Sequence, residues 1–330
     1  MKASSAKISV IVPIYNGDKY LLRALNSILD QSIARELLQV IMIDDGSTDN
    51  SAAVARTFVS SHPYTFKLIV QENAGTAASR NRALDEVSTK YVTFLDQDDY
   101  FDKTYLAELY KVAEETDADV TACGYRRVSE TGKVLYTREL NKSTWAPYIH
   151  LEAWGKLHKT EFINRINARF FANVFGEDLP FSVAENLSAK YVITDETCYN
   201  WFLNTESVSS TIHKQYSEIN LNALLEKLLV FAKLPLIEYQ VLTVATYGLL
   251  HSNVRATKKE FINNVECSMG FLLEKLPNLP NNKYLMNAPD GCPIMTRVAA
   301  KVMLHSFLRG KYSMLWIGYK LFIKRLLAQK

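Results

Sequence analysis

Short apolar runs alternate with amphipathic stretches over the first 127 residues, and this alternation limits the possible folds more than any other feature. The pattern is typical of strand–helix–strand units around a mostly parallel sheet. Leu21, Leu25 and Ile28 lie at helical spacing between the first two runs, so we expect them in the core. The predicted fold class is α/β. The apolar runs are Ile8 to Ile14, Val40 to Ile43, Phe66 to Val70, Tyr91 to Leu95 and Val120 to Tyr125.

Length, charge and cysteine spacing narrow the class of protein. A chain of 330 residues is long enough for one large and one smaller domain. The net charge of +3 is too small to indicate a nucleic-acid partner. The four cysteines lie too far apart for a zinc site. We expect a cytoplasmic protein, because the sequence has neither a signal segment nor an apolar run of about 18 residues.

Polar residues follow four of the apolar runs directly. In open α/β sheets, ligands bind beyond the carboxyl ends of the strands. We therefore expect these polar segments to line a single cleft. They are residues 13–17 (PIYNG), 44–47 (DDGS), 72–75 (ENAG) and 96–99 (DQDD).

The acidic group Asp96, Asp98 and Asp99 is the strongest chemical signal. Carboxylates at a strand end can converge on one hard cation, and a diphosphate can supply the remaining oxygen ligands. The alternative is a solvated loop before the next helix, with Asp102 as its N-cap. So much negative charge needs a counter-ion, which favours a Mn²⁺ or Mg²⁺ site.

Two further strand ends suit a nucleotide. Asp44 and Asp45 can accept hydrogen bonds from a base or a ribose, although the glycine and hydroxyl residues that follow them also suit a turn and a helix cap. Asn73 and Arg80 open a helix whose backbone N–H groups and guanidinium suit a diphosphate. Arg80 could instead pair with Asp85 at the surface.

These segments resemble the family 2 glycosyltransferases of the GT-A fold. The motifs ISVIVPIYNG, VIMIDDGSTDNS, ENAGTAASRNRAL and YVTFLDQDD stand in family order and spacing. GEDLPF at residues 176–181 and WGKL at residues 154–157 extend the resemblance, which covers about residues 7–212. It implies a Rossmann-like GT-A sheet flanked by helices and followed by a mainly helical C-terminal region.

The resemblance also implies residue roles. Asp45 would pair with a uracil edge, Arg80 would face the diphosphate, and Asp96 and Asp98 would serve the ribose and the metal. Asp178 would be the catalytic base, with Glu177 positioning it or contacting the acceptor. The predicted donor-binding residues are Pro13, Tyr15, Asn16, Asp45, Asn73, Arg80, Asp96 and Lys156. Family members often carry an arginine within the segment that here reads YNWF, residues 199–202, so its phosphate contact is replaced or absent.

Three of these assignments have alternatives. Displacement at an anomeric carbon needs a carboxylate to take the acceptor's proton, which suits Asp178, but an acid also favours a helix N-terminus. His213 stands where some members of this fold supply a third metal ligand, although a lone histidine is more often a surface or core residue. Lys156 and His158 could contact the donor phosphates, the acceptor or neither.

The C-terminal part has a different composition. Residues 291–330 contain eight lysines and arginines and no acidic residue, interspersed with apolar side chains. A basic amphipathic helix pair can lie on an anionic membrane, with Trp316 and Tyr319 near the headgroups. The same stripe can instead pack against another subunit of a homo-oligomer.

We therefore expect a transferase domain over residues 1–215, with a nucleotide-sugar half (1–127) and an acceptor and base half (128–215). Residues 216–330 would form a helical region for oligomerisation or for membrane or acceptor association. The predicted function is inverting transfer from a UDP-sugar to a cell-surface glycan or lipid-linked acceptor, as in polysaccharide or teichoic acid biosynthesis, by a cytoplasmic protein peripheral on the inner face of the membrane. A non-catalytic nucleotide-sugar-binding partner is the alternative. A dehydrogenase is disfavoured, because no glycine fingerprint follows the first strand.

Overall fold

The computed structural model describes residues 6–172, 176–204, 218–253 and 256–327. They divide into two compact units. The first holds the described parts of 1–142, 150–172 and 177–205, and the second holds those of 143–149, 173–176 and 206–330.

The first unit is built on a mixed sheet whose strand order is β3-β2-β1-β4-β8-β6-β9-β5, with β7 paired to β6. The pairs β3–β2, β2–β1 and β1–β4 are all parallel. Beyond β4, β8 runs antiparallel to both β4 and β6, and β9 pairs parallel with β6. The strands are β1 (Ile8–Ile14), β2 (Leu38–Asp44), β3 (Phe66–Val70), β4 (Tyr91–Phe94), β5 (Tyr100–Phe101), β6 (Val120–Val128), β7 (Val134–Arg138), β8 (Lys156–Lys159) and β9 (Tyr191–Phe202).

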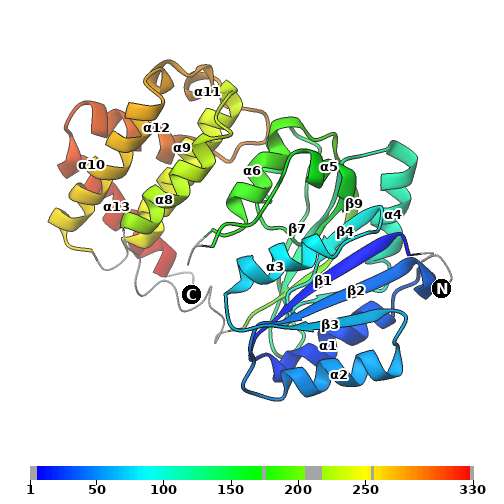
Figure 1. Cartoon of the computed structure of the whole chain (residues 1–330). Helices are drawn as coiled ribbons and strands as arrows, with labels where there is room; N and C mark the ends of the chain where they lie inside the picture. The colour runs from blue at the N-terminus through cyan, green and yellow to red at the C-terminus, as the bar shows by residue number, and fades with distance from the viewer. Residues whose placement is uncertain (1–5, 173–175, 205–217, 254–255, 328–330) are drawn as a thin grey trace. The chain divides into compact units, whose positions relative to one another are not determined.

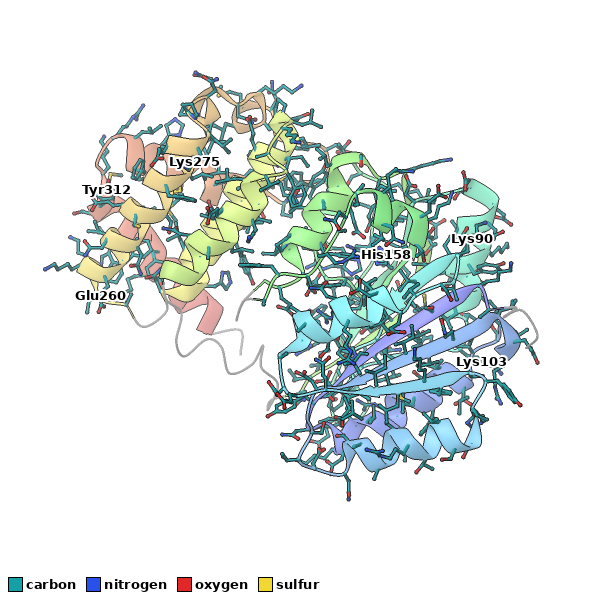
Figure 2. All side chains as sticks on the ribbon, viewed as in Figure 1. Lys90, Lys103, His158, Glu260, Lys275 and Tyr312 are labelled. Atoms are coloured by element: carbon teal, nitrogen blue, oxygen red, sulfur yellow. The ribbon has the colours of Figure 1, made fainter. Side chains whose placement is uncertain are left out.

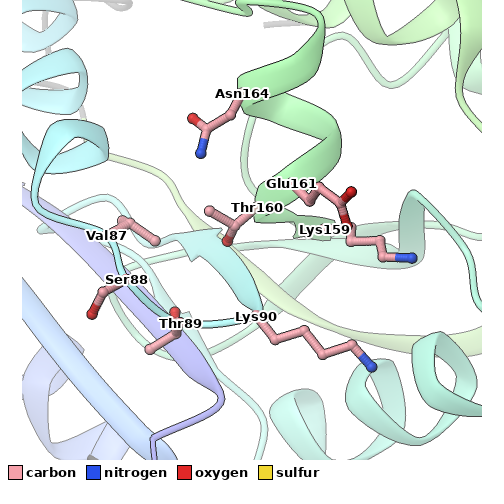
Figure 3. A pocket seen from close by; sticks show the side chains of 8 residues that line it. All are labelled: Val87, Ser88, Thr89, Lys90, Lys159, Thr160, Glu161 and Asn164. Carbon is pink, nitrogen blue, oxygen red and sulfur yellow. The ribbon is translucent and has the colours of Figure 1, made fainter.

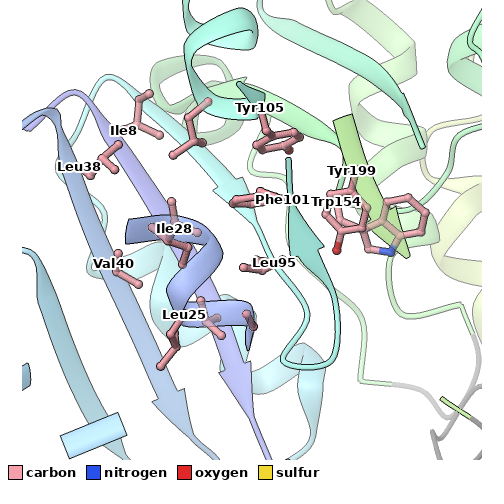
Figure 4. Close-up of a cluster of buried hydrophobic side chains, with 14 of the residues drawn as sticks. Ile8, Leu25, Ile28, Leu38, Val40, Leu95, Phe101, Tyr105, Trp154 and Tyr199 are labelled. Carbon is pink, nitrogen blue, oxygen red and sulfur yellow. The ribbon is translucent and has the colours of Figure 1, made fainter. Parts of the chain in front are cut away.

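Helices flank this sheet, as Figure 1 shows for α1 and α2 beside β1, β2 and β3. Leu21, Leu25 and Ile28 of α1 are buried, as their spacing predicts, and pack with the inward side chains of β1 and β2 (Figure 4). The α/β prediction is thus confirmed. The helices of this unit are α1 (Asp18–Leu29), α2 (Ser51–Ser61), α3 (Thr76–Asp85), α4 (Tyr105–Thr116), α5 (Thr160–Arg165) and α6 (Leu179–Ser188).

The second unit is helical among its described residues. The ring of Trp145 stacks on Tyr148 at 4.7 Å and lies 5.4 Å from Tyr239, so the segment 143–149 packs with the helices. No helix within the described ranges is long and apolar enough to span a bilayer. The helices are α8 (Glu218–Leu229), α9 (Pro235–Ser252), α10 (Lys258–Lys275), α11 (Lys283–Met286), α12 (Ile294–Leu308) and α13 (Tyr312–Leu327).

Tyr319 differs from its expected position near membrane headgroups. It is 2% exposed, and its ring stacks on Phe261 of α10 at 4.4 Å. Trp316 is also near Phe261, at 5.5 Å between ring centroids. These aromatic residues anchor α13 to α10, because large rings bury more apolar area there than they would at a polar surface.

Candidate active site

Arg80 is the centre of a charged cluster at the carboxyl end of the sheet. Its guanidinium is buried, and Nη2 donates to Oδ1 of Asp96 at 2.6 Å. Nη1 donates to Oδ1 of Asp178 at 2.8 Å and to Oε1 of Glu177 at 3.4 Å. One arginine of α3 therefore joins the acidic turn after β4 to both acids that precede α6. Arg80 is not paired with Asp85.

An aromatic layer fixes the position of this guanidinium. Arg80 lies 5.2 Å from the ring centroid of Phe170, which stacks on Phe181 at 4.5 Å. Asn81, the next residue on α3, holds the backbone of Phe170 by donating to its carbonyl and accepting from its N–H, both at 2.9 Å. A planar cation against an aromatic face keeps a defined orientation. Arg80 is thus held for contact with the carboxylates.

The two acids before α6 have different surroundings. Asp178 bonds Arg80 with one oxygen, and its Oδ2 accepts from the N–H of Ala153 at 3.2 Å. Burial and the charge of Asp178 raise the pKa of Glu177 to about 8, although Arg80 acts in the opposite direction. Asp178 is thus held by two donors, whereas the raised pKa of Glu177 favours its protonated form.

Asp98 and Asp99, in the acidic turn between β4 and β5, have different contacts. Asp99 is fully buried and accepts from the hydroxyl of Tyr199 and the N–H of Phe202, both at 2.7 Å. It therefore ties the turn to β9. Asp98 accepts from Nδ2 of Asn204 at 2.9 Å, and burial together with the charge of Asp96 raises its pKa.

Asp96 and Asp98 have the chemistry of a divalent-cation site. Two neighbouring carboxylates that disfavour each other's charge are stabilised by a hard cation, which prefers oxygen ligands. Within the described ranges no group of three histidine, cysteine or acidic side chains forms a complete metal site. His213, the predicted third ligand, lies outside the described residues. The two aspartates fit a metal whose remaining ligands come from elsewhere, such as a diphosphate.

Asp45 organises the loop after β3. Its carboxylate accepts from the N–H groups of Ala74 at 2.9 Å and Gly75 at 2.8 Å, and from Nε2 of Gln71 at 2.7 Å. Gly75 has a φ of +88°, which a glycine adopts without strain. The backbone N–H groups of Ala74 and Gly75, just before the helix start that was expected to face a diphosphate, therefore donate to Asp45. Asn73 is exposed beside them.

The loop after β1 is held by a residue that the sequence interpretation missed. Gln97 accepts from the N–H of Tyr15 at 2.9 Å and donates to its carbonyl at 2.8 Å. A Cβ on Gly17 would lie 2.3 Å from Cδ of Gln97, so a larger residue there would displace the Gln97 side chain from Tyr15. Asn16 accepts from the N–H of Thr48 at 2.8 Å. The ring of Tyr15 remains 46% exposed, beside the acidic turn that carries Gln97.

Two of the predicted donor-binding residues, Lys156 and Pro13, are buried in this structure. Lys156 has no exposed side-chain area, and its Nζ lies 3.4 Å from Oε2 of Glu185. Glu185 therefore balances the positive charge of Lys156 inside the protein, because a buried ammonium requires a counter-charge. Pro13 is buried within β1, opposite Ile43.

His158 belongs to the same buried group as Lys156. Its Nδ1 lies 2.5 Å from Oε1 of Glu185, and neither side chain is exposed. Figure 2 labels this histidine, which also has a ring-nitrogen contact of 3.2 Å to the carbonyl of Ala153. Because the N–H of Ala153 donates to Asp178, one peptide segment connects the buried ion group with the predicted base.

The hollow drawn in Figure 3 lies elsewhere. Its volume is about 500 Å³, and it is lined by residues 87–90, which precede β4, and by residues from the end of β8 and from α5. Its lysines are already paired, Lys90 with Glu114 at 2.6 Å and Lys159 with Asp117 at 2.7 Å. This hollow therefore has no role in the candidate site, which is at the opposite ends of the strands.

Comparison with known proteins agrees with this architecture. The profile described as "Glycosyl transferase family 2" matches residues 9–176. The chain belongs to this family. That range contains the strand ends, Arg80 and the acidic turn, whereas Glu177 and Asp178 lie just beyond it.

Relatives in the family are similar over much of the chain. Glycosyltransferase GlyA of Streptococcus pneumoniae is 29% identical over 69% of this chain, which spans 35% of GlyA. The glycosyltransferase YibD of Escherichia coli is 29% identical over 69% of the chain and 72% of its own length. The minor teichoic acid biosynthesis protein GgaA of Bacillus subtilis is 37% identical over 39% of the chain and 30% of its own length.

Solved structures share the fold. TarS residues 1–349 of S. aureus, in complex with UDP-GlcNAc, superpose with a TM-score of 0.68 at 19% identity, over 92% of both chains. A mannosyltransferase of Pyrobaculum calidifontis, in complex with GDP-Man and Mn²⁺, has a TM-score of 0.57 at 18% identity, over 92% of this chain and 87% of its own. At these identities the similarity shows the fold alone.

Proposed function

We propose that the chain is an inverting glycosyltransferase that moves one sugar from a UDP-sugar to a hydroxyl group of a cell-surface glycan or lipid-linked acceptor. The observation that carries this proposal is the bridge from Arg80 to Asp96 and Asp178. Through Arg80, the acidic turn after β4, which suits a metal and a diphosphate, is connected to Asp178, a carboxylate that suits deprotonation of an acceptor. Membership of glycosyl transferase family 2 supports it.

Asp178 is the proposed general base. The oxygen of the acceptor hydroxyl attacks the anomeric carbon, and the bond from that carbon to the diphosphate oxygen breaks. The acceptor's proton passes to a carboxylate oxygen of Asp178, and the electron pair of the broken bond leaves with the diphosphate. One displacement from the opposite face inverts the anomeric configuration. Glu177 positions this arrangement or contacts the acceptor.

Asp96 and Asp98 are the proposed ligands of Mn²⁺ or Mg²⁺. A bound divalent cation neutralises charge that develops on a leaving nucleoside diphosphate. The mutual charge repulsion at this turn supports the assignment, and the Mn²⁺ in the mannosyltransferase complex is consistent with it. His213 remains a proposed third ligand. Arg80 keeps the carboxylate of Asp96 in place for this role.

The proposed donor base is uracil, recognised at Asp45, and the UDP-GlcNAc in the TarS complex supports this choice. Each oxygen of Asp45 already accepts a backbone N–H, so a uracil N–H must use a remaining lone pair. Titration with uridine, guanosine and cytidine diphosphates tests this step. We expect the tightest binding for the uridine compound, and equal affinities would exclude recognition of the base.

The deciding experiment for the function is incubation with Mn²⁺ and a panel of nucleotide sugars, scoring slow hydrolysis of each donor. We expect turnover of a UDP-sugar that stops when a chelator removes the metal. Donor binding without turnover, in the presence of acceptor candidates, would favour the alternative of a non-catalytic nucleotide-sugar-binding partner.

We propose that residues 1–215 perform the transfer and that residues 216–330 bring the enzyme to its acceptor from the cytoplasmic side. The two candidate contacts for the C-terminal region are an anionic membrane surface and another subunit. A lipid-linked acceptor would make membrane contact useful, because the enzyme and its acceptor would then meet at the same membrane surface.

A further inference from the structure

The solvent-facing side of α12 is unlike an ordinary exposed helix face. Ile294, Met295, Val298 and Val302 are between 46% and 68% exposed. A surface helix normally buries its apolar residues and presents polar ones to water. The remaining exposed positions between residues 294 and 305 are Arg297, Lys301 and His305, so this face is apolar and basic only.

The next helix, α13, repeats the pattern. Met314, Ile317 and Leu321 recur at intervals of three and four residues, and each is between 60% and 70% exposed. Leu315 and Tyr319 are buried, so the exposed apolar stripe is a separate face from the one that packs inside the unit. Lys320 stands beside the stripe, with its ammonium 4.4 Å from the ring of Trp316.

We propose that these faces of α12 and α13 form a docking surface for an anionic lipid bilayer. The apolar side chains would enter the region between headgroups and acyl chains, and the basic side chains would contact lipid phosphates. Arg297 and Lys301 are both exposed, and no salt bridge within the described ranges involves either of them, although the charge of Arg297 acts to lower the pKa of Tyr239 and Cys292.

Charge distinguishes this partner from a second copy of the chain. In a two-fold symmetric dimer the same patch meets itself. The exposed basic residues of this surface include Arg297, Lys301 and Lys320, and residues 291–330 contain no acid, so such a contact would bring like charges together without any counter-charge from the patch. An anionic leaflet supplies that counter-charge across the whole surface. The inference depends on neither the donor nor the catalytic mechanism proposed above.

Flotation of the full chain with vesicles tests the proposal. The vesicles contain phosphatidylcholine alone, or with about a third phosphatidylglycerol, at low salt and at about 0.5 M salt. We expect flotation with the anionic vesicles, little with phosphatidylcholine alone, and a marked decrease at high salt. Combined Arg297→Gln and Lys301→Gln should lower the partition coefficient about 30-fold, the equivalent of two lipid–cation contacts.

A matched pair of variants tests the apolar part. Met295→Glu places a charge in the docking surface and should weaken binding at least about tenfold. Met286→Glu is the control, because Met286 is 76% exposed but lies on α11, outside this surface. Unchanged circular dichroism and thermal unfolding would show that both variants are folded, whether or not any transferase activity is found.

Four results would overturn the proposal. They are the absence of flotation, equal flotation with neutral and anionic vesicles, binding by Met295→Glu that matches that of Met286→Glu, and a salt-insensitive oligomer in light scattering that does not float. The last result would identify a second copy of the chain as the occupant of this face.

Discussion

Replacing Arg80 by Met removes the cation that joins Asp96, Asp178 and Glu177. The guanidinium is 3% exposed and contacts Asp96, Asp178 and Glu177 at 2.6, 2.8 and 3.4 Å. Methionine keeps a long apolar side chain against Phe170 but removes the positive charge that the three carboxylates share. The folded state should therefore lose stability, and Asp178 should lose its defined position.

The stability loss can be bounded from the geometry. Breaking a buried ion pair by removing one partner costs about 3–5 kcal/mol. The partner carboxylates here are between 15% and 30% exposed, and water screens part of their repulsion. We therefore expect Arg80→Met to lower the free energy of unfolding by about 3 kcal/mol, at the lower end of that range.

Arg169→Met is the matched control. Arg169 pairs with Asp85 at 3.3 Å, with side chains 35% and 67% exposed. A surface pair of this kind contributes at most about 1 kcal/mol. Urea denaturation of the two variants gives both values directly. A loss for Arg80→Met no larger than that for Arg169→Met would refute the view that Arg80 organises the site.

The pH dependence of the Arg80→Met loss provides a second measurement. Three neighbouring carboxylates without Arg80 repel one another when ionised and are relieved when protons bind. The deficit relative to the native protein should thus be largest above about pH 8, where Glu177 is ionised in the native protein, and shrink as the pH falls through that value. Sugar transfer should fall at least about a hundredfold, as expected when a reacting group is displaced by about 1 Å. A deficit that grows on acidification would contradict this electrostatic explanation.

Three other substitutions test separate parts of the site. Folding raises the pKa of Glu177, so the stability that its protonated form contributes is fully present below the ordinary glutamate pKa and is lost as the pH rises through about 8. Glutamine does not titrate. Relative to the native protein, Glu177→Gln should therefore gain at least about 1.4 kcal/mol in unfolding free energy between about pH 5 and pH 9. Glu185→Gln should cost about 3–5 kcal/mol in urea denaturation, because it leaves the ammonium of Lys156 buried without its carboxylate, and a loss below 1 kcal/mol would show that the pair is dispensable. Asp98→Ala should abolish Mn²⁺-dependent binding of the donor in calorimetry while thermal unfolding stays cooperative; native metal affinity in this variant would rule out Asp98 as a ligand.

Local sequence pattern predicts much of the transferase unit, because strand and helix periodicity depend on near neighbours. The apolar runs correspond to β1, β2, β3, β4 and β6, and the α1 residues at helical spacing are buried. The acidic turn also follows its strand as expected. Residues 276–293, which separate α10 from α12, contain only a short 3-10 helix (Leu279–Asn281) and the short α11.

Contacts between distant residues could not be predicted in the same way. Lys156 resembles a ligand-binding residue in its local motif, and nothing near it indicates that Glu185, on another element, neutralises it in the interior. Gln97 stands between two aspartates whose charges draw attention, yet its role depends on reaching Tyr15 of the first loop. The folded sheet, and not the residues adjacent in the sequence, determines which side chains contact one another.

The central claim is that Asp178 acts as the base of a single inverting displacement. The most direct measurement is the anomeric configuration of the transferred sugar, followed by NMR during turnover by the native protein and by Asp178→Asn. Asparagine keeps the size of the side chain and removes its basicity, so we expect donor binding to persist while kcat falls about a hundredfold or more. The product of the native protein should carry the inverted configuration. Retention of the donor's configuration, or full activity of Asp178→Asn, would contradict the mechanism.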